Sequence, residues 1–74
     1  MTPEENMIRL FQGLNQAYLE IAQFLTQTRT RRNQLIESGI PVTNTEVVTL
    51  QNVIGSTERQ LGEIAISMRS LRGT

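Results

Sequence analysis

Four residue types that carry much of protein chemistry are absent from this 74-residue chain: cysteine, histidine, lysine and aspartate. Without cysteine there is no disulfide, and without cysteine or histidine a zinc or haem site lacks its usual sulfur and nitrogen ligands. A chain this short buries only about 60% of its unfolded surface, so a single core is marginal without a staple. Because two kinds of staple are missing, oligomerisation becomes the favoured means of stabilisation.

The same absences argue against catalysis. General acid–base and nucleophilic mechanisms usually place a base beside a nucleophile, and here only scattered glutamates remain. The glycine-containing stretches "LGEIAI" and "VIGSTE" have neither the spacing nor the preceding strand of a phosphate-binding loop. We therefore expect no enzyme activity, no catalytic residue, no cofactor and no metal site.

The charge balance is even, since all seven basic residues are arginine and all seven acidic residues are glutamate. A neutral chain has no overall field to attract nucleic acid or a membrane surface. No stretch approaches the roughly 18 apolar residues of a membrane span, and the acidic start "MTPEENMIRLF" is unlike a signal peptide. We expect a cytoplasmic protein that does not enter a membrane.

Helix signals open and close the first half of the chain. Thr2, followed by proline, and Glu5 have the spacing of a capping box. At the other end, Gly39 can adopt the left-handed conformation and Pro41 forbids continuation. These signals predict a helix over about residues 3–38.

A second set of signals follows at once in "VTNTEV". Thr43 and Glu46 have the spacing of another capping box, and Val42 and Val47 occupy the two positions of a hydrophobic staple. The sequence therefore predicts that a new helix begins directly after the turn.

This second helix is expected over about 44–72, with Gly73 as its stop. A turn at about 39–43 has the length that joins antiparallel neighbours. The prediction is one all-α domain over 1–74, an antiparallel two-helix hairpin.

Both helices repeat residues at alternating spacings of three and four, which is typical of a coiled-coil seam. On the first helix these residues are Met7, Phe11, Leu14, Tyr18, Ile21, Leu25, Thr28, Arg32 and Leu35. On the second they are Val47, Leu50, Ile54, Thr57, Leu61, Ile64, Met68 and Leu71. The pattern predicts that these two rows face each other.

The apolar surface is wider than this seam. The first helix adds Leu10, Ala17 and Phe24 on one side of the seam, and Ile8, Ala22 and Ile36 on the other. The second helix adds Val53, Ala65 and Ile66. One partner helix cannot cover so broad a stripe. The pattern predicts that a second copy covers it in a twofold four-helix bundle, with the helix of another protein as the alternative.

Gly55 and Gly62 lie seven residues apart on one side of the second helix. A glycine inside a helix costs about 1 kcal/mol relative to alanine. Close approach of another backbone would compensate for that cost, and tolerated surface glycines are the equally weighted alternative.

The most basic stretch of the chain is "LTQTRTRRNQL". Arg32 falls in the seam, whereas Arg29 and Arg31 flank it on opposite sides. A hairpin that pairs residues whose numbers add to roughly 82 places Glu58 on the side of Arg29 and Glu46 on the side of Arg31. The favoured interpretation is structural, with Arg32 fixing the register as a polar seam residue. Contact with an acidic protein partner and binding of nucleic acid or phosphate are the alternatives.

From the sequence we expect a non-enzymatic protein–protein interaction module, such as a small adaptor, chaperone or assembly subunit, that acts as a homodimer or with a helical partner. The predicted interface residues are Leu10, Phe11, Leu14, Tyr18, Ile21, Phe24, Leu25, Ile54, Leu61, Ile64 and Met68. Polar partner contacts would come from Arg29, Arg31 and Arg32. The alternative is a small nucleic-acid-binding hairpin dimer that uses these three arginines.

Overall fold

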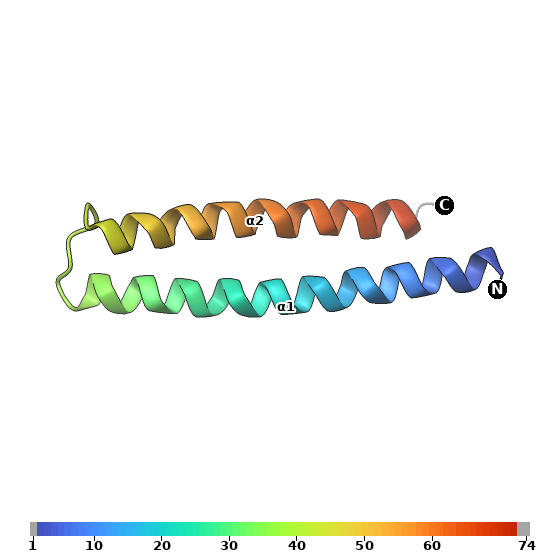
Figure 1. Cartoon of the computed structure of the whole chain (residues 1–74), viewed down its shortest axis with the longest axis horizontal. Helices are drawn as coiled ribbons and strands as arrows, with labels where there is room; N and C mark the ends of the chain where they lie inside the picture. The colour runs from blue at the N-terminus through green and yellow to red at the C-terminus, as the bar shows by residue number, and fades with distance from the viewer. Residues whose placement is uncertain (1, 73–74) are drawn as a thin grey trace.

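A computed structural model describes residues 2–72 of the chain as two long helices (Figure 1). Helix α1 spans Pro3–Glu37 and helix α2 spans Thr45–Arg72. They lie side by side and antiparallel in a rod of 56 × 15 × 14 Å. The predicted all-α hairpin is confirmed, with α1 ending and α2 beginning one residue from the expected positions. The expected stop at Gly73 lies outside the described residues.

The start of α1 is the predicted capping box. The side chain of Thr2 accepts a hydrogen bond from the backbone N–H of Glu5, and the Glu5 carboxylate accepts one from the backbone N–H of Thr2. Two backbone donors that have no partner inside the helix are thereby satisfied.

The end of α1 follows from the predicted glycine. Gly39 has a φ of +92°, a left-handed conformation that a side chain disfavours. The N–H of Gly39 donates to the carbonyl of Ile36, and the N–H of Ile40 donates to the carbonyl of Leu35. This pair of bonds is a Schellman motif, which closes the helix and turns the chain back.

The start of α2 differs from the prediction. Asn44, and not Thr43, caps the helix, because its Oδ1 accepts from the N–H of Glu46 at 2.9 Å and its carbonyl accepts from the N–H of Val48. Asparagine is at least as good an N-cap as threonine. The shift by one residue also removes Val42 from the staple position, and its side chain is 63% exposed.

The predicted seam is confirmed by burial, because every residue in both rows is buried or half-buried. Within residues 2–72, the buried side chains all lie in the half of the hairpin nearer the turn. They are Leu25, Thr28, Val47, Ile54 and Thr57. Seam residues in the open half, nearer the termini, are only half-buried. The hairpin therefore has a closed half and an incompletely covered half.

The two buried threonines fit the seam because their hydroxyls are satisfied locally. Thr28 donates to the carbonyl of Phe24 at 2.8 Å, and Thr57 donates to the carbonyl of Val53 at 2.7 Å. Each bond stays within its own helix. No buried polar group is therefore left without a partner at either position.

At the open end α1 extends past the end of α2 (Figure 1). The guanidinium of Arg72, the last residue of α2, lies 5.3 Å from the ring centre of Phe11. The start of α1 therefore extends past α2, although Met7 and Ile8 still line a hollow together with Leu71 and Arg72. Ile8 and Leu10, near this end, are more than half exposed.

Candidate interaction surface

Two ion pairs join the helices near the turn, and both were predicted from the sequence. Arg29 Nη2 lies 3.1 Å from Glu58 Oε1, and Arg31 Nη2 lies 3.2 Å from Glu46 Oε1. All four side chains are roughly half exposed, so each pair contributes only about 0.2–1 kcal/mol to stability. Their main consequence is geometric, because they fix which flanks of the two helices adjoin.

Arg32 lies in the seam as predicted and directs its head group to polar side chains. Its Nη1 donates to Gln51 Oε1 at 3.0 Å, and its Nε donates to Asn33 Oδ1 at 3.2 Å. We did not predict Gln51 as the partner, although the pairing rule that locates Glu46 and Glu58 also places it opposite Arg32. All three clustered arginines thus bind side chains of their own hairpin.

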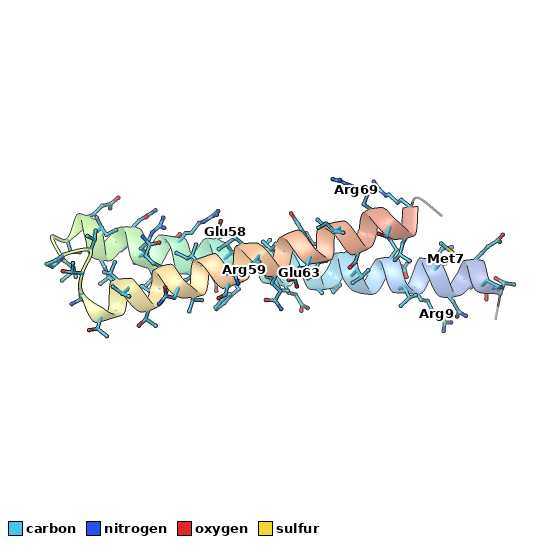
Figure 2. The ribbon with its side chains drawn as sticks, turned by 90° about the horizontal axis from the view of Figure 1, so that it is seen from above. Met7, Arg9, Glu58, Arg59, Glu63 and Arg69 are labelled. Carbon is cyan, nitrogen blue, oxygen red and sulfur yellow. The ribbon has the colours of Figure 1, made fainter. Side chains whose placement is uncertain are left out.

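The ion pairs divide the surface of the hairpin into two long sides. The side of Arg31–Glu46, here called the Phe24 face, is defined by the residues at seven-residue spacing from that pair: Leu10, Ala17, Phe24, Val53, Gln60 and Ser67. The side of Arg29–Glu58, the Ala22 face, is defined likewise by Ile8, Asn15, Ala22, Gln51, Ala65 and Arg72. At the open end Arg9 and Arg69 lie on opposite sides of the rod (Figure 2).

The predicted interface residues fall into three groups by burial. Leu25 and Ile54 are buried between the two helices of the chain itself. Half-buried positions in the seam are Phe11, Leu14, Tyr18, Ile21, Leu61, Ile64 and Met68. Leu10 and Phe24, by contrast, are 57% and 49% exposed. The residues that a partner can reach directly are therefore those beside the seam.

Two adjoining hollows open on the Phe24 face in the open half of the hairpin. One is lined by Asn6, Arg9, Leu10, Gly13 and Leu14. The other is lined by Leu10, Leu14, Ile66, Ser67, Ser70 and Leu71. Leu10 and Leu14 belong to both, so the hollows form one continuous apolar depression with hydroxyl groups along its α2 edge.

The Ala22 face also has an apolar hollow in the open half, lined by Met7, Ile8, Phe11, Gln12, Leu71 and Arg72, and a more polar hollow beside it. Arg72 lies over the Phe11 ring, and Arg69 and Asn15 line a hollow next to it together with Tyr18. The Arg29–Glu58 pair lies on this face nearer the turn. The cation–π contact between Arg72 and Phe11 was not predicted from the sequence, since it depends on where α2 ends along α1.

The three glycines inside the helices do not allow a close approach between α1 and α2. A Cβ atom added at Gly13, Gly55 or Gly62 would meet nothing within 4 Å. Close approach of α1 to the glycines of α2 is thus excluded as the compensation for their cost in helix stability. All three positions face open space in a single hairpin.

The accessible surface of the hairpin is 5545 Å². A compact monomer of its mass, 8.4 kDa, exposes about 4600 Å². The radius of gyration, 16.8 Å, likewise exceeds the roughly 11 Å of a compact domain of this length. The excess of about 900 Å² is close to the roughly 800 Å² that each partner buries in a standard protein–protein interface.

Among residues 2–72, no group of three or more metal-ligating side chains is placed to hold an ion, and no helix is long and apolar enough to cross a membrane. In comparisons with protein-family models, curated proteins and solved structures, nothing matches this chain. Its function must therefore be argued from its own surface.

Proposed function

We propose that this hairpin is a non-enzymatic protein–protein interaction module that acts by burying its exposed apolar stripe against other helices. The observation that carries the proposal is the accessible surface, which exceeds that of a compact monomer by about one standard interface side. A small adaptor, chaperone or assembly subunit of this kind contributes two helices to a larger bundle.

The distribution of burial supports this function. The turn half of the hairpin has buried side chains and one ion pair on each face, so its own two helices cover the seam there. The open half has only half-buried seam residues, and it exposes Leu10 and Ile66 around an apolar hollow. Because exposed apolar surface of this kind favours association, the open half is the part that a partner completes.

Nucleic-acid binding through Arg29, Arg31 and Arg32 has less support. A phosphate-binding surface needs cationic groups that are free to exchange counterions for phosphates. Here Arg29 and Arg31 are paired with glutamates on opposite faces, and Arg32 donates to Gln51. The arginines therefore form no single basic row.

Sedimentation equilibrium combined with circular dichroism tests the proposed function. We expect helix content and the unfolding midpoint to rise with protein concentration from about 1 to about 100 µM, or on addition of a helical partner. A monomer that unfolds cooperatively, with a free energy of unfolding of about 5 kcal/mol or more at every concentration, would refute the proposal. Such a chain would be stable without burying its apolar stripe against another helix.

A further inference from the structure

The two faces of the hairpin differ in how well they suit a dry interface. On the Phe24 face, the six residues that define it are uncharged, and the charged side chain that lines its hollows is Arg9. On the Ala22 face, Glu58 lies on the α2 flank and is paired with Arg29, and Arg72 lies at the open end. Burial of half-exposed charges is costly, so the Phe24 face is the better docking surface.

This face is complementary to itself. Leu10 and Phe24 lie seven residues before and after Ala17, on the same flank of α1. If two α1 helices stack antiparallel with their alanines at position 17 opposed, the Phe24 of each lies level with the partner's Leu10. The exposed ring then enters the hollow lined by Leu10, Gly13 and Leu14. Small side chains at the centre let the backbones approach, and large ones meet hollows at both ends.

The unequal lengths of the helices select the orientation. The start of α1 extends past the end of α2 (Figure 1). If the second hairpin were stacked with its turn at the same end, its α2 would lie over the α1 of the first. That α2 ends at the same level as the α2 of the first hairpin, so it would leave the start of α1 uncovered. Only the antiparallel arrangement, with α1 on α1, covers this extension with the second half of the partner's α1.

The positions of the charged residues favour the same antiparallel orientation. The extension carries Glu4 and Glu5 in the first turn of α1. In the antiparallel stack these carboxylates come near the level of the partner's Arg31, which lies on the Phe24 face. Opposite charges thus meet at each end of the interface.

From these observations we infer that the occupant of the Phe24 face is a second copy of this chain. It stacks antiparallel about a twofold axis at Ala17, with each Phe24 seated in the partner's hollow at Leu10 and Gly13. This inference rests on the proposed function, for which it names the partner, the face and the geometry.

Single cysteines test the geometry directly, because the chain contains none of its own. Ala17→Cys and Ala22→Cys are matched variants, since both alanines are half-buried and flank the seam on opposite sides. A disulfide needs Cα atoms about 4.4–6.8 Å apart. Under mild oxidation we expect Ala17→Cys to form a covalent dimer within minutes and Ala22→Cys to remain largely uncrosslinked. Efficient crosslinking at Ala22 but not at Ala17 would overturn the proposed face.

A second matched pair measures affinity. Leu10 and Ile8 are 57% and 56% exposed, and they lie on the Phe24 face and the Ala22 face respectively. We expect Leu10→Glu to weaken dimerisation by about 30-fold or more, as at a central interface residue, and Ile8→Glu to weaken it by less than about 3-fold. Both variants are assayed by sedimentation equilibrium, with circular dichroism to check that helix content is retained.

The outcomes separate this inference from the proposed function. A dimer that Ile8→Glu disrupts and Leu10→Glu does not refutes the Phe24 face and leaves the function standing. A wild-type chain that is monomeric and only partly helical refutes the second copy and points to a different helical partner. A monomer that is stable at every concentration refutes both.

Discussion

Replacement of three helical glycines, one at a time, by alanine is a sensitive test of where the hairpin is covered. Gly13 lies on α1, whereas Gly55 and Gly62 lie on α2, and all three are interior to their helices. An added Cβ meets nothing within 4 Å at any of them. Within a single chain the three substitutions are therefore sterically equivalent.

The magnitude follows from helix propensity. Alanine is favoured over glycine by about 1 kcal/mol in a helix interior, because glycine loses more backbone freedom on folding. For a domain of this size that gain raises the unfolding midpoint by about 4–8 °C. We expect Gly55→Ala and Gly62→Ala to show this increase, because these positions stay open to solvent in the antiparallel dimer.

Gly13 has a different role in the dimer, since it lines the hollow that receives the partner's Phe24. A methyl group there narrows the hollow while it stabilises the isolated helix. We expect Gly13→Ala to raise the midpoint by less than the other two substitutions and to weaken dimerisation.

Thermal unfolding followed by circular dichroism at two or more protein concentrations separates the two effects. Only association makes the midpoint depend on concentration. Equal gains in all three variants, with unchanged association, would show that the hollow at Gly13 is empty. A loss of stability in Gly55→Ala and Gly62→Ala would show instead that another helix approaches α2 on their side.

Three further results are expected from the hairpin itself. Ile54→Ala should destabilise the fold by about 2–5 kcal/mol in denaturant unfolding, because Ile54 is buried in the closed half of the seam; a smaller loss would mean that the seam is loosely packed. Gly39→Ala should cost about 1–2 kcal/mol in the same assay, because the residue there has a φ of +92°. Arg29→Gln and Arg31→Gln should each change stability by less than about 1 kcal/mol, since the ion pairs are half exposed. A strong loss of nucleic-acid affinity in these two arginine variants, with a flatter salt dependence, would revive the nucleic-acid alternative.

Local sequence signals determined most of the hairpin. The capping box at Thr2 and Glu5 and the left-handed Gly39 involve residues only a few positions apart, so their chemistry can be read without the fold. The ion pairs of Arg29 and Arg31 were also predictable, because a short antiparallel turn fixes which residues of the two helices adjoin. The N-cap of α2 was misassigned because Thr43 and Asn44 are both good caps, and sequence spacing alone does not choose between them.

The candidate surface was only partly predictable. Helical periodicity identified a stripe wider than the seam and named Leu10 and Phe24 as part of it, but it treated the two flanks as equivalent. The residues that line the hollow on each flank depend on how far α2 runs along α1, because that distance sets the positions of Arg72 and Ser67 against α1.

By itself, then, the sequence determined two capped helices, an antiparallel turn, the seam that joins them and the polar pairs beside it, because each of these depends on spacing along one chain. Only the tertiary structure decided that the turn half is closed and the open half is not. It also decided that the glycines face open space and that an apolar hollow lies on the Phe24 face. These features arise from the relative lengths and lateral packing of the two helices, which no local pattern records.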